Sequence, residues 1–227
     1  MSKRFLFLTI LLITTLGIIS YKITHAFFSD TASSTENIFA AATLFPTPTP
    51  SIANHLVINE VLYDTSTSQN ISGQGGSNRG EFVEIYNPTG STVDLTGWII
   101  EDNSATSGAE LLSGTLSSNS FLIITGATST EFQAIWTVPG GTFFVQADNG
   151  TIGNGLANGG DTIVLKNNVG TIVDKMSWGT DTSGFSTGCS GSCPTVLTGH
   201  SLERDPDGTD IDNSGDFIDR LTPAPGS

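Results

Sequence analysis

The chain has 227 residues, with 22 acidic and 8 basic side chains and a formal net charge of −14. A phosphate backbone is bound by clustered lysine and arginine that displace its counterions, so this charge balance argues against unaided nucleic-acid binding. Glycine is plentiful (26 residues) and only 13% of the residues are charged, which is typical of short strands joined by turns and not of a helical protein.

The first 26 residues have the three parts of a signal peptide. A short basic start precedes an uncharged apolar run over residues 5–21, and Thr24 and Ala26 are the small residues that a signal peptidase reads. We therefore predict cleavage between Ala26 and Phe27 and a secreted or cell-surface protein. The alternative is an uncleaved membrane anchor, for which the apolar run is slightly short.

Two further segments separate this signal from the folded domain. Residues 27–44 contain Phe27-Phe28-Ser29-Asp30 and Asn37-Ile38-Phe39-Ala40, a pattern that resembles the SipW-type signal region. That resemblance implies export from a bacterial cell and cleavage by a dedicated peptidase, as on biofilm-matrix and camelysin-like proteins. Residues 45–53 follow, with proline at every second position from Pro46 to Pro50, which predicts an extended, semi-rigid spacer.

The remaining residues, 54–227, are predicted to form one all-β domain. Strands rich in β-branched and aromatic residues are expected at 56–63, 81–87, 93–102, 121–125, 143–146, 161–166 and 171–178, with one short helix at 128–136. Alternation places Val83 and Ile85 on one face of their strand, and we expect them in the core with Trp98 and Trp178. Short strands separated by turns favour a sandwich or a barrel.

Seven short motifs occur in the order in which the lamin tail domain has them. The chain resembles that family at Ile58-Asn59-Glu60-Val61, Glu81-Phe82-Val83-Glu84-Ile85-Tyr86-Asn87, Asp94-Leu95-Thr96-Gly97-Trp98, Leu156-Ala157-Asn158-Gly159-Gly160-Asp161, Gly170-Thr171-Ile172-Val173-Asp174, Gly199-His200-Ser201-Leu202-Glu203-Arg204 and Pro223-Ala224-Pro225-Gly226. The resemblance implies an immunoglobulin-like β-sandwich. It does not imply the nuclear role of the eukaryotic members, whose heptad-bearing rod and prenylation box the sequence lacks.

An acidic segment near the C-terminus is a candidate calcium site. Oxygen-bearing side chains occupy the first, third, fifth and seventh positions of an EF-hand-like loop: Asp210, Asp212, Ser214 and Asp216. Gly215 stands at the sixth position, but Leu221 replaces the glutamate expected at the twelfth, and no helices flank the loop. The alternative is a solvated acidic turn whose carboxylates cap backbone N–H groups. No other cofactor is predicted.

The two cysteines, Cys189 and Cys193, are predicted to form a disulfide. An exported chain meets oxidising conditions, and a zinc site would need two more ligands that the nearby sequence does not supply. A ring closed over so few residues mainly restrains its own loop.

Glu60 is the one charged residue of its strand and shares a face with Ile58 and Leu62 when strict alternation is assumed. A buried carboxylate needs a partner, because an unpaired charge in the interior is costly. We expect a structural ion pair with Arg204.

No nucleophile elbow, zinc-protease motif or spaced carboxylate pair is present, so an enzyme is not predicted. The main hypothesis is an exported, non-enzymatic interaction module that presents the loops at 65–80, 147–158 and 179–199 to a surface protein, an envelope glycan or a second copy of itself. One alternative is calcium-dependent adhesion or assembly through residues 205–219. Another is an accessory module to a secreted nuclease, because prokaryotic lamin-tail domains look like exported modules that are sometimes attached to such enzymes.

Overall fold

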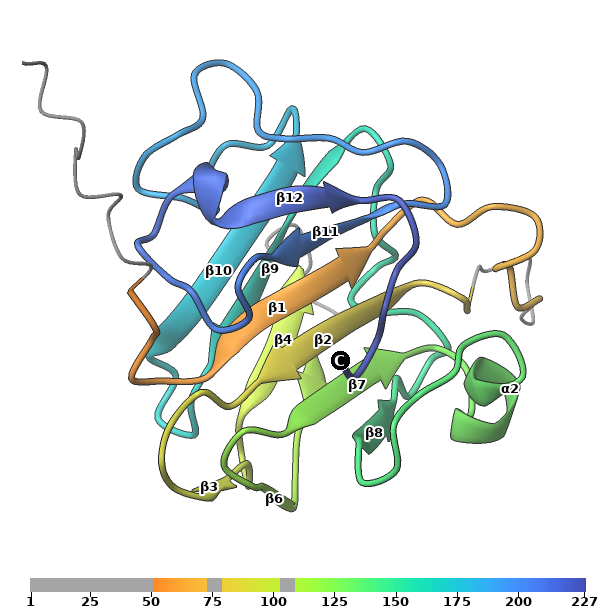
Figure 1. Cartoon of the computed structure of the whole chain (residues 1–227), viewed down its shortest axis with the longest axis vertical. Coiled ribbons are helices and arrows are strands. Elements are labelled where there is room, and N and C mark those ends of the chain that lie inside the picture. The colour runs from red at the N-terminus through yellow and green to blue at the C-terminus, as the bar shows by residue number, and fades with distance from the viewer. Residues whose placement is uncertain (1–50, 73–78, 103–108) are drawn as a thin grey trace, which may run out of the picture. The chain divides into compact units, whose positions relative to one another are not determined.

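The computed structural model describes residues 51–72, 79–102 and 109–227. The predicted signal peptide, its cleavage position, the SipW-type segment and most of the proline-rich spacer lie outside these ranges. The described residues from Ser51 onward belong to one compact unit, whose regular secondary structure is almost entirely β-strand (Figure 1). In the part of the chain that the structure describes, no helix is both long and apolar enough to cross a membrane.

The larger of two sheets has six strands. In spatial order they are β12 (Phe217–Arg220), β11 (Ser201–Arg204), β1 (Val57–Leu62), β2 (Phe82–Tyr86), β7 (Phe121–Thr125) and β8 (Phe143–Gln146). Neighbouring strands are antiparallel except β7 and β8, which are parallel. The last strand of the chain therefore lies at one edge, beside β11, while β1 is central.

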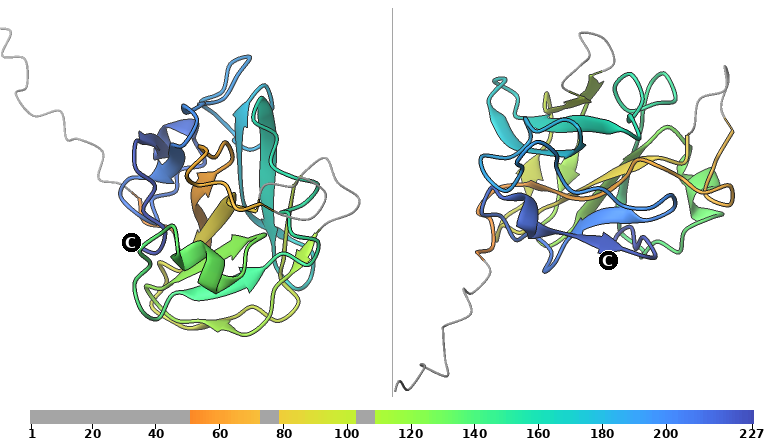
Figure 2. Two further views of the ribbon diagram at one scale, coloured as in Figure 1. Left: turned by 90° about the vertical axis from the view of Figure 1, so that its right-hand side faces the viewer. Right: turned by 90° about the horizontal axis from the view of Figure 1, so that it is seen from above.

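The smaller sheet has four strands and faces the larger one. Its order is β10 (Ile172–Gly179), β9 (Gly160–Lys166), β4 (Ile99–Asp102) and β5 (Glu110–Leu111), and β3 (Val93–Asp94) pairs separately with β6 (Thr115–Leu116). The strands of the two sheets lie in separate layers (Figure 2). The predicted all-β, immunoglobulin-like sandwich is confirmed. The strand predicted at 93–102 is divided in two, because Gly97 takes a left-handed turn with φ +80°.

The core lies between the two sheets. Val83, Ile85 and Trp178 are fully buried in it, and Trp98 packs against its margin while remaining partly exposed. Each of the three buried residues alternates along its strand with a side chain on the other face, as the period of a half-buried strand requires. Burial of this kind stabilises the fold by about 1.5–3 kcal/mol for each large apolar side chain.

A β-bulge in β1 changes which side chains share a face. The pairing of β1 with β2 shifts between Ile58 and Glu60, so Ile58 lies in the core while Glu60 and Leu62 lie on the outer face of the sheet. The expectation that Glu60 and Ile58 share a face is therefore wrong, because the extra residue of the bulge, Asn59, interrupts the alternation.

A second apolar cluster covers part of that outer face. The helix α2 (Ser129–Gln133) begins at Thr128, whose hydroxyl and the Glu131 carboxylate form a reciprocal capping box. Its Phe132 packs with Trp136 on apolar side chains of β1, β2 and β7, namely Leu62, Phe82 and Ile123. The helix is shorter than the predicted 128–136, but the segment serves to cover this end of the larger sheet (Figure 1).

Candidate functional site

Loops that are far apart in the sequence meet at Asp64, directly after β1. One Asp64 carboxylate oxygen accepts a hydrogen bond from the Asn158 amide at 2.7 Å, and the other accepts from the Thr198 hydroxyl at 2.7 Å. The Asp64 carbonyl also accepts from the Gly199 N–H at 2.7 Å. We call Asp64, Gln69, Asn158, Thr198 and Gly199 the Asp64 cluster. Its hub is half-buried, so the three loops are joined at the surface and not in the core.

Gln69 connects the loop that follows β1 to the loop that contains Gly199. Its side-chain N–H donates to the Gly199 carbonyl at 2.9 Å, and its side-chain oxygen accepts from the Ser66 N–H at 2.8 Å. Gly199 has φ +89°, and a Cβ there would lie 3.2 Å from both Gln69 Oε1 and Ser66 Cβ. A side chain at residue 199 would therefore separate the loops, and only glycine suits this close approach.

Buried aromatic residues of the core support the loops of the Asp64 cluster. Tyr63 stacks on Trp178 with ring centroids 4.7 Å apart, and its hydroxyl accepts from the Val196 N–H at 2.8 Å. The Trp178 indole N–H donates to the Ala157 carbonyl at 2.8 Å. Both loops that meet Asp64 from the C-terminal side are thus fixed to buried aromatic rings. Beside them, Leu197 is 70% exposed.

Only parts of the three predicted loops join this site. Residues 65–72 and 197–199 do so, whereas residues 73–78 lie outside the described residues. Of the segment 147–158, Asn158 alone contacts Asp64. Its earlier part lies against β4, where the Asn154 N–H donates to the Asp102 carboxylate at 2.8 Å.

The predicted disulfide is confirmed. Cys189 and Cys193 are bonded, with their Cα atoms 4.8 Å apart. Cys193 is buried at the edge of the core, and its N–H donates to the Gly179 carbonyl at 2.8 Å. The disulfide therefore fixes the first half of the segment 179–199 to the end of β10 and leaves the second half to the Asp64 cluster.

At the opposite end of β1, Arg204 is enclosed by three carboxylates. Its guanidinium contacts Asp174 at 3.1 Å and both Asp210 and Asp216 at 3.3 Å, and its side chain is only 1% exposed. We call these four residues the Arg204 junction. Because Asp174 belongs to β10 and Arg204 to β11, this contact joins the two sheets across the end of the core.

Backbone and aromatic groups complete the surroundings of this guanidinium. It donates to the Ile58 carbonyl at 2.8 Å and to the Thr209 carbonyl at 2.5 Å, and it lies 4.5 Å from the centre of the Phe217 ring. An arginine buried with so many acceptors is stabilised, whereas the same charge alone would be costly.

The predicted ion pair between Glu60 and Arg204 is wrong. In the pairing of β1 with β11, Glu60 lies opposite Glu203, so the next residue, Arg204, projects from the other face of the sheet. A shift of one residue is enough to separate the two charges, because side chains alternate between faces along a strand.

The calcium candidates lie close to this guanidinium. Asp210 and Asp216 face Arg204, Asp212 accepts the Ser186 N–H at 3.3 Å, and Ser214 lies in a short 3-10 turn, η2 (Ser214–Asp216). Among residues 51–72, 79–102 and 109–227, no group of three or more His, Cys, Asp or Glu side chains is arranged to hold a metal ion. Calcium binding stays a prediction, and the acidic loop already contacts a buried cation.

The charge balance of the junction is reflected in its acidities. Burial acts to raise the pKa of Asp210, but the hydrogen bond from His55 and the charge of Arg204 outweigh it and lower that pKa to about 2. Burial raises the pKa of Asp174 in spite of the same arginine. The hydrogen bond with Asp210 also raises the pKa of His55. The carboxylate nearer to solvent is thus the more strongly ionised.

The outer face of the larger sheet carries three buried glutamates in a row across neighbouring strands. Glu84, Glu60 and Glu203 lie opposite one another on β2, β1 and β11, and each is at most 2% exposed. We call them the glutamate row. Arg220 pairs with Glu203 only, and one oxygen of Glu60 is buried without a hydrogen-bond partner. The sequence showed Glu60 and Glu84 as single glutamates in two predicted strands and Glu203 only as part of a lamin-tail motif.

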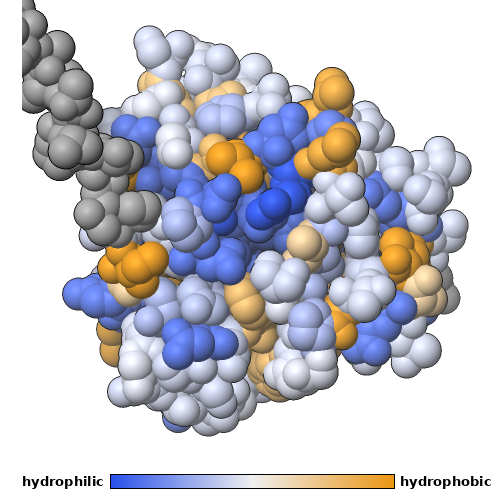
Figure 3. Space-filling model, in the orientation of Figure 1, coloured by the Kyte–Doolittle hydropathy of each residue, from blue (hydrophilic) through white to orange (hydrophobic). Residues whose placement is uncertain are grey.

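The C-terminal tail, residues 221–227, crosses over this row (Figure 1). The Ala224 N–H donates to Glu60 at 3.1 Å and the Gly226 N–H donates to Glu84 at 2.5 Å. Desolvation raises the pKa of Glu60 to about 8 and raises that of Glu84 well above its usual range. Seen from this side, hydrophilic residues form a central band and apolar residues form separate small spots (Figure 3).

Comparison with known proteins identifies one family. The family model described as Lamin Tail Domain matches residues 49–180, more than half of the chain, which confirms the resemblance seen in the sequence. Among solved structures, a DUF4876 family protein from Bacteroides thetaiotaomicron VPI-5482 is 13% identical, with a TM-score of 0.46 over 75% of this chain and 72% of that chain. No curated protein matches. The SipW-type region stays a prediction.

Proposed function

The chain belongs to the Lamin Tail Domain family, and from this premise we propose that it is an exported, non-enzymatic interaction module of the cell surface or the extracellular space. Its contact surface is the Asp64 cluster. Its partner is a protein of the cell surface that packs against Leu197 and hydrogen-bonds to the amides and hydroxyls around it.

The observation that carries this proposal is the convergence of three distant segments on one half-buried carboxylate. Asp64 holds Asn158 and Thr198 at 2.7 Å each, and these loops rest on the Tyr63–Trp178 stack. Recognition loops on a rigid scaffold lose little conformational entropy when they bind, so their contacts contribute more fully to affinity.

The composition of the surface supports a protein partner. Leu197 is an exposed apolar residue with the polar groups of Asn158 and Thr198 nearby, which is the arrangement of an apolar centre and a polar rim at protein interfaces. The guanidinium of Arg79 at this end is already paired, because it contacts Glu131 through two hydrogen bonds at 2.6 and 3.2 Å. Among the described residues of this surface, no exposed cationic cluster is present that could bind a nucleic acid.

Export is supported by two features of the chain. The N-terminal sequence has the basic, apolar and small-residue parts of a signal peptide. The disulfide between Cys189 and Cys193 is of the kind that persists in oxidising compartments.

The export part is tested by cell fractionation of a bacterium that produces the full chain. We expect the domain in the medium or accessible to protease added to intact cells, with Phe27 as the first residue of the mature chain. A protein that stays in the cytoplasm and still begins at Met1 would contradict export.

The binding part is tested by sedimentation of the purified chain with isolated bacterial envelopes. We expect Asp64→Ala to reduce retention about tenfold, equivalent to about 1.4 kcal/mol, because the three loops lose their common partner. Asp94→Ala is the matched control, since Asp94 is an exposed aspartate at the end of β3 and is not part of the Asp64 cluster. Its carboxylate accepts the Thr96 N–H. Protease treatment of the envelopes should abolish retention, because the proposed partner is a protein. Equal retention of the two variants would overturn the site.

A further inference from the structure

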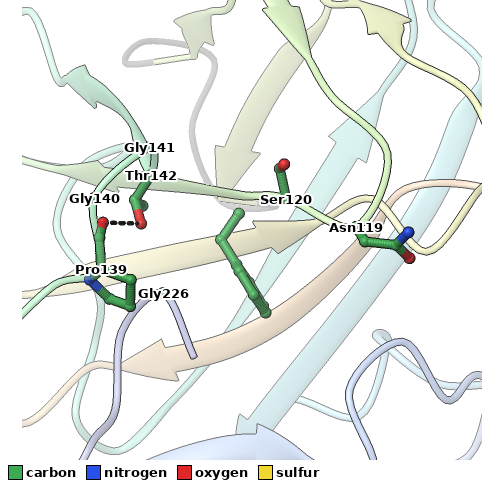
Figure 4. A pocket seen from close by; sticks show the side chains of 8 residues that line it. Asn119, Ser120, Pro139, Gly140, Gly141, Thr142 and Gly226 are labelled. Carbon is green, nitrogen blue, oxygen red and sulfur yellow. Dashed lines mark hydrogen bonds between the residues drawn. The ribbon is translucent and has the colours of Figure 1, made fainter.

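A cavity of about 220 Å³ opens at the other end of the molecule from the Asp64 cluster. Its walls come from the residues that lead into β7, from the loop that joins α2 to β8, and from Gly226 of the C-terminal tail (Figure 4). A Cβ on Gly226 would lie 2.9 Å from the Thr142 hydroxyl and 3.0 Å from Pro139, so the tail packs closely on that loop. The docked tail therefore completes the cavity.

An aromatic side chain contributes the apolar part of this cavity. Phe121, which is partly exposed, stacks on Tyr86 with centroids 4.5 Å apart and an interplanar angle of 27°. Tyr86 is held from another side by Gly208, where a Cβ would lie 3.0 Å from the ring. Phe121 is thus a fixed surface of the kind on which a ligand stacks, and it needs little ordering when one binds.

Most of the other residues that line the cavity are polar or glycine, and they leave open space. Asn119, Ser120 and Thr142 supply one amide and two hydroxyls, and the labelled side chains of Ser120 and Asn119 extend from one stretch of backbone (Figure 4). At Gly140 and Gly141 an added Cβ would meet nothing within 4 Å. The Thr142 hydroxyl donates to the Pro139 carbonyl at 2.9 Å and the Asn119 amide donates to the Ser118 hydroxyl at 3.1 Å. A ligand can therefore use the oxygen lone pairs of these groups and the second amide hydrogen of Asn119.

Asn119 is held in an uncommon backbone conformation at the rim. Its φ is +53°, and its N–H donates to the Asn87 carbonyl at 2.8 Å. Residues other than glycine seldom adopt this left-handed region, although asparagine tolerates it better than most. The Asn119 side-chain oxygen accepts a hydrogen bond from the Tyr86 hydroxyl at 3.4 Å, so the amide lies at the ring on which Phe121 stacks.

The charge of the lining restricts the chemistry of the ligand. Among the described residues that line the cavity, none is ionisable, and the nearby Glu84 is engaged by the Gly226 N–H at 2.5 Å. A phosphate, a carboxylate or a metal ion would find no counter-charge here. A sugar ring fits, because it has an apolar C–H face for stacking and hydroxyls for neutral donors and acceptors.

We propose that this cavity is a binding site for one ring of a neutral saccharide, which stacks on Phe121 and hydrogen-bonds to Asn119, Ser120 and Thr142. The site is separate from the Asp64 cluster and does not depend on the protein partner proposed there. It would give the module a second ligand of a different chemical class.

The proposal is tested by following backbone amide resonances of the ¹⁵N-labelled chain while glucose, galactose or N-acetylglucosamine is added. We expect at least one sugar to shift the signals of Gly140, Gly141 and Gly226 with a dissociation constant on the order of 1 mM, as a single small ring allows. The signals of the Asp64 cluster should not move.

The decisive variant is Asn119→Gly, which removes the amide while glycine adopts the same φ freely. We expect it to weaken sugar binding at least tenfold. Asp212→Gly is the matched control, since Asp212 is the other described residue besides glycine with a positive φ, +55°, and does not line the cavity. Phe121→Leu should weaken binding as well, with a thermal melt to verify its fold.

Two results would overturn the proposal. In the first, none of the three sugars shifts these resonances even when it is added well above millimolar concentration. In the second, Asn119→Gly binds the sugar as tightly as the unaltered chain does. Neither result touches the function proposed for the Asp64 cluster, because envelope retention of Asn119→Gly reports on that site separately.

Discussion

The Arg204 junction and the glutamate row each bring three carboxylates together at β11, and they do so in different ways. They begin at adjacent residues, because Glu203 and Arg204 project from opposite faces of β11. In the junction, one buried guanidinium contacts all three carboxylates. In the row, Arg220 contacts only Glu203, while Glu60 and Glu84 receive the N–H groups of the C-terminal tail.

Asp210 of the junction and Glu60 of the row therefore respond to protons in opposite directions. The pKa of Asp210 is lowered to about 2, so its ionised form is favoured in the folded protein. The pKa of Glu60 is raised to about 8, mainly by desolvation, so its protonated form is favoured. Asp174 shows the limit of this contrast, because its deeper burial raises its pKa in spite of Arg204.

The largest effect is expected from removing the cation of the junction. Arg204→Met leaves Asp174 and Asp216 without their cationic partner and Asp210 with His55 alone. We expect it to lower the free energy of unfolding by about 3–5 kcal/mol. Urea denaturation at neutral pH measures this change, with the slope of the transition checked for a constant exposed area.

The matched control is Lys166→Met, which breaks the ion pair with Glu101. Both side chains of that pair are partly exposed, at 28% and 21%, so the loss should be about 1 kcal/mol or less. If the two variants lose the same stability, the junction does not hold the sheets together and the comparison fails.

The next effect is the pH dependence caused by the glutamate row. Glu60 has a higher pKa in the folded protein, about 8, than its usual value of 4.5, so the folded state binds more protons between these values. Stability is then fully present below about pH 4.5 and falls as the pH rises toward 8, by up to about 1.4 kcal/mol per pH unit for each such group. Glu60→Gln, which resembles the protonated acid, should flatten this slope.

Thermal melts between pH 5 and pH 9 measure the slope in the unaltered chain and in Glu60→Gln. The junction sets the opposite limit, because stability from Asp210 is present above its usual pKa of 3.8 and is lost as the pH falls toward 2. If the melting temperatures of the two proteins depend on pH in the same way between pH 5 and pH 8, Glu60 is ionised in the folded protein. Protonation then does not stabilise the glutamate row.

The smallest effect is expected from calcium. Asp210 and Asp216 already contact Arg204, so we expect the melting temperature to be the same with calcium and with a chelator. A bound ion at one hundred times its dissociation constant would add about 2.7 kcal/mol, which a calorimetric melt detects readily. A clear upward shift would show that the acidic loop can exchange its arginine contacts for a metal.

Much of the fold could be predicted from the sequence. Runs of β-branched and aromatic residues indicate the strands β1, β2, β7, β9 and β10, and the turn at 167–170 joins the last two. The short strands β11 and β12 were not predicted, because each is only four residues long and at least half of its residues are polar, in a glycine- and aspartate-rich region. The lamin-tail motifs nevertheless include β11.

The partners of individual charges could not be predicted. Glu60 was assigned to Arg204 on the assumption of strict alternation, and the bulge at Asn59 together with the pairing of Glu60 with Glu203 placed it on the other face. Asp64 gave no signal either, because its contacts with Asn158 and Thr198 join residues 94 and 134 positions away. Contacts of this kind depend on how the sheets pack and not on local propensity.

The sequence by itself determined the class of fold and the disulfide, a local ring between Cys189 and Cys193. It also predicts the export signal. These features are local or periodic, so neighbouring residues are enough to define them. Only the tertiary structure decided that Arg204 contacts three aspartates while Glu203, one residue earlier, belongs to the glutamate row. The reason is that register fixes the face on which every side chain lies, and a single bulge reverses that assignment for the residues beyond it.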